Sequence, residues 1–243
     1  MLNAECRVLQ PCFAFCIFHF PFCITLSASL SSPTIIALGD STTAGTPGFK
    51  SPIEAPPDGA GNVESQYAHW LMKTHPDWRV LNRGVDGERS DQIRARFDRD
   101  VLGKRGREPA PVPDVAIIIA GVNDIYQGRS ATTVQRELEA MYDAARAAMI
   151  PVVAGTIIPF NTATRDQNER MRAVNQWIRE YAAHHSDEIA CCDTRAAVAA
   201  PEASDRLVSS PDDLHPSPDG YRLMALALEP VIKRALARAH PLL

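Results

Sequence analysis

Five short apolar runs recur along the chain from residue 34 onward, and segments with helical periodicity separate them. Each run is rich in Val and Ile and is bounded by Gly, Pro or Asp, which is typical of strands buried on both faces of a sheet. The runs cover residues 34–38, 78–82, 114–120, 150–156 and 188–193. Helices are predicted over residues 64–74, 90–102, 132–149 and 166–184.

Strands that alternate with helices predict a parallel, doubly wound α/β sheet. A last helix is expected to begin at Pro218, with Ser217 as its N-cap. The chain has 243 residues, of which 45% are hydrophobic, so residues 32–243 suffice for one domain with a sizeable core. The stretch 46–63 is rich in Pro and Gly and predicts no regular element. Because it follows the first strand, we expect it to line the site and, together with the segment 160–170, to set the shape of the pocket.

The segment 1–31 differs in composition from the rest of the chain. Its apolar run 13–26 is broken only by His19 and Pro21, and small residues follow it. This order is typical of a secretory signal peptide and predicts a secreted or periplasmic protein. An uncleaved anchor, a misassigned start and an artefact are the alternatives, and the last would leave a cytoplasmic protein. The run is short for a membrane span, so no stable membrane partner is expected.

The formal net charge of −4 and the lack of a basic run give no reason to expect a nucleic-acid partner. Cys191 and Cys192 are adjacent on a predicted strand, so they are expected on opposite faces as small buried side chains. No CxxC or HExxH motif is present. The histidines at 69 and 75 are interpreted as structural, and those at 184 and 185 as a solvated helix end. The expected oligomeric state is a monomer.

Residues with chemical potential follow the predicted strands. In an open parallel sheet, ligands bind outside the carboxyl ends of the strands. The segments at these ends read GDS over 39–41, NRGVDG over 82–87 and GVND over 121–124, and DDLH over 212–215 follows the fifth strand across a loop. A hydroxyl, glycine turns, an amide and an Asp/His pair are therefore predicted at one edge of the sheet.

This set of groups suits acyl transfer. A serine hydroxyl needs a base to take its proton, and a histidine serves near neutral pH. An aspartate fixes the histidine tautomer, and N–H donors stabilise the developing oxyanion. The G-x-S-x-G elbow of α/β-hydrolases is missing, because Thr43 occupies the position of its last glycine.

The four segments resemble, in the same order, the sequence blocks of GDSL/SGNH hydrolases, and the resemblance extends from residue 34 to about 238. It implies a three-layer α/β/α, flavodoxin-like fold with a five-stranded parallel sheet. It also implies cleavage of carboxylic esters or thioesters through an acyl-enzyme, without a metal or cofactor.

The resemblance further implies a role for each matching residue. Ser41 is the nucleophile, His215 the base and Asp212 the group that orients the base. The N–H groups of Ser41 and Gly87 and the side-chain amide of Asn123 form the oxyanion hole. Two alternatives stay open, because Gly84 is a second candidate donor and Asp213 is a neighbour of Asp212. Turn-stabilising hydrogen bonds are expected for Asp40 and Asp124.

Together these features predict a serine esterase that acts on small-molecule esters with short acyl chains. A carbohydrate acetylesterase, a thioesterase and an acyltransferase use the same residues and stay open as alternatives. Two hypotheses come from other classes of protein. One is a binding protein that kept the fold without catalysis, and the other is a metal-dependent phosphoesterase that uses Asp40, Asp212 and His215.

Overall fold

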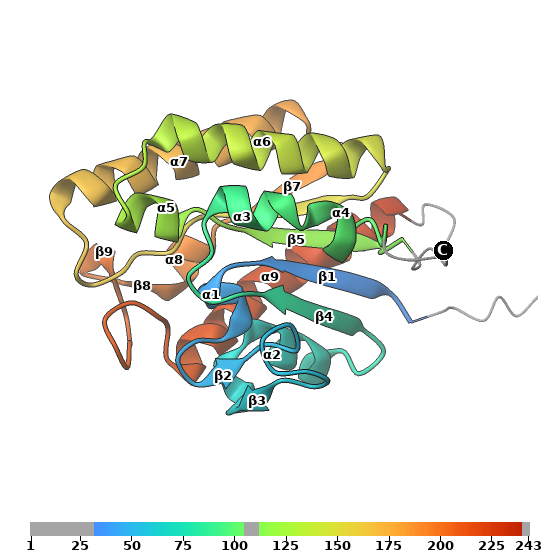
Figure 1. Ribbon diagram of the computed structural model, residues 1–243, viewed down its shortest axis with the longest axis horizontal. Coiled ribbons are helices and arrows are strands. Elements are labelled where there is room, and N and C mark those ends of the chain that lie inside the picture. The colour runs from blue at the N-terminus through green and yellow to red at the C-terminus, as the bar shows by residue number, and fades with distance from the viewer. Residues whose placement is uncertain (1–31, 105–111, 240–243) are drawn as a thin grey trace, which may run out of the picture. The chain divides into compact units, whose positions relative to one another are not determined.

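The computed structural model describes residues 32–104 and 112–239, so the predicted signal peptide lies outside the described residues. Five parallel strands form the central sheet in the order β4-β1-β5-β6-β7 (Figure 1). They are β1 (Thr34–Gly39), β4 (Arg79–Gly84), β5 (Val115–Ile119), β6 (Val152–Gly155) and β7 (Ile189–Cys192). All five predicted strands are confirmed. Because the chain leaves β1 toward β4 and then returns to β5 on its other side, a crevice is expected at the carboxyl end of β1.

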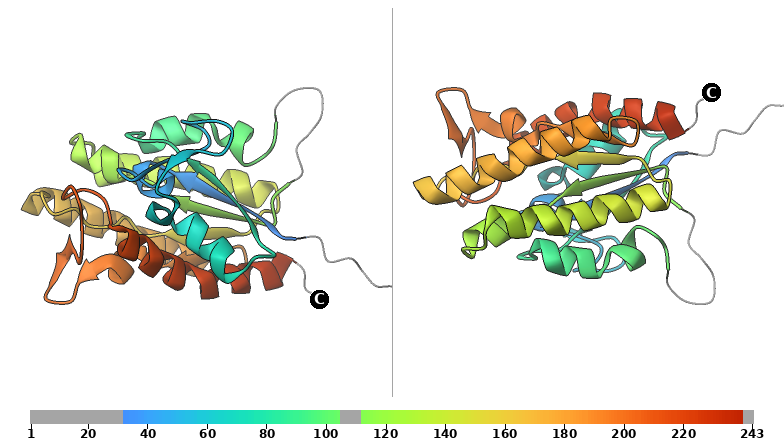
Figure 2. Two further views of the ribbon diagram at one scale, coloured as in Figure 1. Left: turned by 90° about the horizontal axis from the view of Figure 1, so that it is seen from below. Right: turned by 90° about the horizontal axis from the view of Figure 1, so that it is seen from above.

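Helices cover both faces of this sheet, which gives three layers (Figure 2). One face packs against α3 (Ser90–Ala95), α4 (Phe97–Asp100), α6 (Ala131–Ala147) and α7 (Arg165–His184). The other face packs against α2 (Tyr67–Thr74), α8 (Thr194–Val198) and α9 (Pro218–Ala239). The predicted three-layer, doubly wound fold is confirmed.

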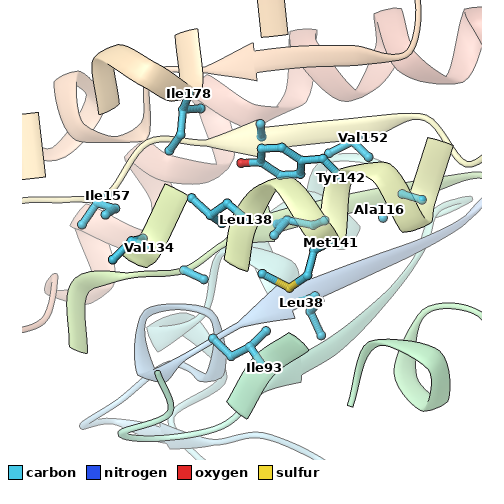
Figure 3. Packing of buried hydrophobic residues seen from close by; sticks show 14 of the residues in the cluster. Leu38, Ile93, Ala116, Val134, Leu138, Met141, Tyr142, Val152, Ile157 and Ile178 are labelled. Atoms are coloured by element: carbon cyan, nitrogen blue, oxygen red, sulfur yellow. The ribbon is translucent and has the colours of Figure 1, made fainter. Parts of the chain in front are cut away.

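Side chains alternate between the two faces along each strand, as the pleat of a strand requires. On β1, Ile36 and Leu38 belong to the core under α6, whereas Ile35 belongs to the core under α9. Figure 3 shows the first of these cores, where Leu138 and Met141 of α6 point toward the sheet. A strand that buries both faces needs a continuous apolar run, which is why the strands were recognisable in the sequence.

The two adjacent cysteines follow the same rule. Cys191 packs into the core under α6 and α7, and Cys192 into the core under α9, and both are free thiols. Burial raises the pKa of Cys191 to about 11 and that of Cys192 to about 12. The prediction that the two small side chains lie on opposite faces is therefore confirmed, with Cys192 buried and Cys191 half-buried.

Two predicted helices are interrupted. The segment 64–74 forms a 3₁₀ turn, η1 (Val63–Ser65), and then α2, with Gln66 extended between them. The segment 90–102 forms α3 and α4, which are separated at Arg96. The last helix begins at Pro218 as predicted, and the hydroxyl of Ser217 accepts the Gly220 N–H at 3.3 Å.

Several short elements were not predicted. The stretch 46–63 consists mostly of turns but also contains an antiparallel pair, β2 (Phe49–Lys50) and β3 (Ala60–Gly61). A second small pair consists of β8 (Ala199–Ala200) and β9 (Ala203–Leu207). The short helices α1 (Ser41–Ala44) and α5 (Val122–Tyr126) follow β1 and β5. Among the described residues, no helix has the length and apolar character needed to cross a membrane.

Candidate active site

Ser41 is the first residue of α1 and lies at the carboxyl end of β1, between the strands β4 and β5. Asp40 caps this helix, because its Oδ1 accepts the Thr42 N–H at 2.9 Å. The predicted turn-stabilising role of Asp40 is thus confirmed. Asp40 is 1% exposed, and this burial raises the pKa of its carboxyl to about 6, against the lowering effect of the Thr42 N–H and of His215.

His215 reaches Ser41 from a loop that follows β9, 174 positions away in the sequence. Its Nε2 lies 2.9 Å from the Ser41 Oγ, and its Nδ1 lies 2.7 Å from Asp212 Oδ2. The other carboxylate oxygen of Asp212 accepts the N–H groups of Leu214 at 3.0 Å and His215 at 2.8 Å. The structure therefore brings the serine, histidine and aspartate into one hydrogen-bonded chain.

The carboxylate of Asp212 stays ionised in this arrangement. Partial burial alone would raise its pKa, but the bonds from the His215 ring and from the two N–H groups outweigh that effect and lower the pKa. An ionised carboxylate at Nδ1 leaves Nε2 as the nitrogen that can accept a proton from Ser41. Asp213, the alternative, points elsewhere, because its Oδ1 accepts from Asn161 at 2.8 Å.

The two candidate glycines differ in what their N–H groups do. The N–H of Gly84 donates to Asn82 Oδ1 at 2.9 Å, so it is already occupied. A Cβ on Gly84 would lie 2.0 Å from the Ala44 nitrogen, which accounts for a glycine at this position. Gly87 has a φ of 71°, open space around it, and no acceptor for its N–H among the described residues. The geometry therefore favours Gly87 as the backbone donor.

Asn123 lies in the first turn of α5, directly after β5. One of its Nδ2 hydrogens goes to the Glu88 carbonyl oxygen at 2.9 Å. A side-chain amide carries two N–H donors, so this bond fixes the amide while the second hydrogen stays available. Because Glu88 directly follows Gly87, this hydrogen bond connects the Asn123 amide to the turn that contains Gly87.

A buried arginine supports the same turn. Arg96 is 6% exposed, and its guanidinium donates to the carbonyl oxygens of Gly39 and Arg83, each at 2.7 Å. It also binds Glu88 Oε2 at 2.6 Å and Asp100 Oδ2 at 2.8 Å. Arg96 thereby joins the ends of β1 and β4 to the turn that carries Gly87. The sequence analysis did not identify this residue.

Asp124 does more than stabilise a turn, which corrects the prediction for this residue. Its fully buried carboxylate accepts the backbone N–H of Ser90 at 2.7 Å and the Ser90 hydroxyl at 2.9 Å. It also pairs with Arg129 at 3.3 Å. Asp124 therefore fastens the start of α3 to α5, and the G-x-N-D segment contributes a structural bond beside the Asn123 amide.

A cavity of about 150 Å³ lies beside Ser41 and His215 at the carboxyl edge of the sheet. Its polar wall consists of Ser41, Thr42, Asp86, Asn123 and His215. Its apolar wall consists of Val122, Tyr126, Phe160 and Leu214. Phe160 belongs to the segment 160–170, which was expected to shape the pocket, whereas Tyr126 and Leu214 were missed because nothing in their sequence context separates them from core residues.

The stretch 46–63 does not line this cavity, so that prediction was wrong. Instead it packs behind the glycine turn, where the Ser51 hydroxyl donates to the Gly84 carbonyl oxygen at 2.6 Å. The Glu54 carboxylate accepts the Asp86 N–H at 3.0 Å, and the Thr46 hydroxyl donates to Asp86 Oδ1 at 3.4 Å. The stretch therefore supports residues of the site from outside.

No cluster of three metal-ligating side chains is found in residues 32–104 and 112–239. His75 stacks on Trp78 and pairs with Glu229 at 2.8 Å, which fits its interpretation as a structural residue. His184 is exposed at the end of α7, where its ring contacts a backbone carbonyl of its own helix. The described residues thus give the phosphoesterase hypothesis no ligand set.

A family model described as the GDSL-like lipase/acylhydrolase family matches residues 37–223. A comparison with curated proteins gives no match. Among solved structures, a lipolytic G-D-S-L family protein from Veillonella parvula is 22% identical with a TM-score of 0.66, over 83% of this chain and 98% of that one. A GDSL-like lipase from Bacteroides thetaiotaomicron is 21% identical with a TM-score of 0.63, over 87% and 94% of the two chains.

The psychrotrophic esterase EstA from Pseudoalteromonas sp., in a structure inhibited by monoethylphosphonate, is 18% identical with a TM-score of 0.61. The similarity covers 84% of this chain and 98% of the esterase. At these identities the solved structures establish a shared fold, and the family model extends over most of the sequence. The chain belongs to the GDSL-like lipase/acylhydrolase family.

Proposed function

We propose that this protein hydrolyses short-chain carboxylic esters through an acyl-enzyme on Ser41. The observation that carries the proposal is the hydrogen bond between the Ser41 hydroxyl and His215 Nε2, with Asp212 on the opposite ring nitrogen. A serine, a base and a group that orients the base are what nucleophilic acyl transfer requires. Membership of a family of lipases and acylhydrolases supports the same reaction class.

In the proposed mechanism, the Ser41 Oγ attacks the ester carbonyl carbon while His215 Nε2 takes the hydroxyl proton. The oxyanion accepts hydrogen bonds from the N–H groups of Ser41 and Gly87 and from the second Asn123 Nδ2 hydrogen. His215 then gives its proton to the leaving alcohol, and the acyl group stays on Ser41. Water, activated by His215, attacks the acyl-enzyme and releases the acid. Asp212 stabilises the imidazolium in both halves of the reaction.

The size of the cavity supports a short acyl chain. At about 150 Å³ it is smaller than the roughly 300–1,000 Å³ of pockets that enclose drug-sized ligands. Phe160 is fully buried, and Tyr126 contacts its ring edge-on at a centroid distance of 5.7 Å. These two rings form part of the apolar wall, and an acyl chain too large for the cavity would have to extend beyond it.

The experiment that tests this proposal compares p-nitrophenyl esters from acetyl to long-chain acyl, with the wild type and with Ser41→Ala and His215→Ala. The expected result is turnover of the short esters by the wild type and a loss of at least about 10³-fold in kcat in both variants. Wild-type activity that persists in Ser41→Ala would overturn the mechanism. Acyl-coenzyme A and acetylated sugars, assayed in parallel, separate the thioesterase and acetylesterase alternatives, and product analysis with added alcohol detects acyl transfer.

A further inference from the structure

One side chain in the cavity carries a charge that the proposed reaction does not use. Apart from His215 and the phenol of Tyr126, Asp86 is the only ionisable side chain among the described residues that line the cavity, and no lysine or arginine lines it. Asp86 is exposed and immediately precedes Gly87. The mouth of the site therefore carries a negative charge beside the position where an ester would react.

This charge is fixed in place and is not neutralised. The Asp86 N–H donates to the Glu54 carboxylate at 3.0 Å, and the Thr46 hydroxyl donates to Asp86 Oδ1 at 3.4 Å. Neither Asp86 nor Glu54 forms an ion pair within residues 32–104 and 112–239. Two arginines lie three positions from Asp86 in the sequence: Arg89 is bound to Asp91 and Gln127, and Arg83 forms no ion pair with Asp86 or Glu54 among the described residues. Two uncompensated carboxylates thus lie together at one side of the cavity.

The order of the strands separates this acidic side from the apolar wall. Asp86 follows β4, which lies on one side of the strand that carries Ser41. Val122 and Tyr126 follow β5, and Phe160 follows β6, both on the other side of that strand. An acyl chain is matched by the apolar wall, so the alcohol part of an ester is directed toward Asp86.

We propose that Asp86 selects esters whose alcohol part is positively charged and disfavours esters with an anionic alcohol part. The inference rests on the proposed esterase function and adds a substrate class to it. An exposed carboxylate is screened by water and salt, so the selectivity is expected to be modest, roughly three- to tenfold in kcat/KM at low ionic strength. It should decrease as salt is added, because the Debye length falls to about 3 Å at 1 M.

A matched pair of esters isolates the charge from the shape. Acetylcholine and 3,3-dimethylbutyl acetate have the same acyl group and nearly the same alcohol, with a quaternary nitrogen in one and a quaternary carbon in the other. The expected result is a higher kcat/KM for acetylcholine with the wild type. In Asp86→Asn, the cation-to-neutral ratio of kcat/KM should fall roughly three- to tenfold, whatever the absolute rates.

The control variant is Asp219→Asn, which removes a carboxylate of the same type from the surface of α9, where the side chain is 84% exposed and does not line the cavity. Its cation-to-neutral ratio should equal that of the wild type. A second ester pair, betaine ethyl ester and ethyl 3,3-dimethylbutanoate, places the charge in the acyl part. A fall in the cation-to-neutral ratio of this pair on Asp86→Asn, without such a fall in the first pair, would overturn the assignment of the alcohol to Asp86.

Failure of this inference can be distinguished from failure of the esterase function. If the wild type cleaves p-nitrophenyl acetate and the two matched esters with a ratio that Asp86→Asn does not change, the inference is wrong and the esterase function stands. If the wild type cleaves none of the esters, the proposed function itself fails. If only p-nitrophenyl acetate is cleaved, the matched esters are compared as competitive inhibitors, and an equal inhibition constant for both would again contradict the inference.

Discussion

Asn161 holds Asp213 through two hydrogen bonds, from its backbone N–H to the Asp213 carbonyl oxygen at 2.7 Å and from its Nδ2 to Asp213 Oδ1 at 2.8 Å. The Asn161 Oδ1 in turn accepts the Leu207 N–H at 2.8 Å, at the end of β9. Asp213 lies between the proposed triad residues Asp212 and His215. Asn161 directly follows Phe160, a residue of the cavity wall. Its side-chain amide therefore connects the loop that carries the proposed base to this wall.

We expect Asn161→Ala to lower kcat about tenfold, because the loss of two side-chain hydrogen bonds of roughly 0.5–1.5 kcal/mol each lets His215 move away from Ser41. Asp213→Asn is the matched control, since its amide oxygen still accepts from Asn161 and since asparagine tolerates the φ of 65° at this position. Steady-state kinetics and thermal unfolding of both variants check this. An Asn161→Ala enzyme with full kcat and a lowered Tm would show that the bond serves stability alone.

We expect Glu88→Ala to lower kcat about tenfold with little change in KM, because it removes a carboxylate that fixes the turn between Gly87 and the Asn123 amide. Glu88→Gln keeps an oxygen for the Arg96 guanidinium and should stay within a few-fold of the wild type. The measurement is kcat and KM for p-nitrophenyl acetate. An increase in KM at constant kcat would mean that Glu88 affects substrate binding and not the transition state.

Alanine at the two glycines should separate folding from catalysis. Gly84→Ala places a Cβ 2.0 Å from the Ala44 nitrogen, so we expect loss of folded protein. Gly87→Ala meets no atom within 4 Å, costs about 1 kcal/mol for its positive φ and keeps its N–H. It should fold and retain at least about a tenth of the activity. Circular dichroism and kcat check both variants, and a stable Gly84→Ala would contradict the packing described here.

The buried carboxyl of Asp40 predicts a pH dependence of stability. Its pKa rises from the usual 3.8 to about 6 in the folded state, so the folded protein binds more protons than the unfolded chain between these values. Stability is therefore lost as pH rises from about 4 to 6, by on the order of 3 kcal/mol from this group. Asp40→Asn keeps an acceptor for the Thr42 N–H and should remove that part of the loss. Urea unfolding of both proteins at pH 4 and pH 8 measures it, and an equal pH dependence in the two would contradict the prediction.

The strands were predictable from the sequence because each is buried on both faces and so requires an unbroken apolar run. The same physics placed Ser41, Asn123 and the glycine turn at one edge of the sheet, since parallel strands share that edge. The break at Arg96 between α3 and α4 was not visible, because helical spacing of apolar residues continues across it. Its cause lies in tertiary contacts, with the carbonyl groups of Gly39 and Arg83, that no local pattern encodes.

The surroundings of the site were predicted less well than its polar groups. The proline- and glycine-rich stretch 46–63 lies behind the site, because its polar side chains find partners on the outer side of β4 and its turn. Most of the apolar wall was not predicted, because its residues carry no distinctive signal in the sequence. Val122, Tyr126 and Leu214 have ordinary apolar side chains, and only the path of the chain in three dimensions determines whether such a side chain faces a core or a cavity.

Ser41 and His215 are 174 positions apart, and the loop of His215 is fastened to Asn161, which follows β6 and also binds the last residue of β9. During synthesis the serine leaves the ribosome long before the histidine exists, and a chain that ends before residue 215 has a hydroxyl with no base. The reactive group therefore forms only in the finished protein. In the proposed mechanism, proteolytic loss of the last helix and the loop before it removes both Asp212 and His215, and the fragment that remains has no base for Ser41.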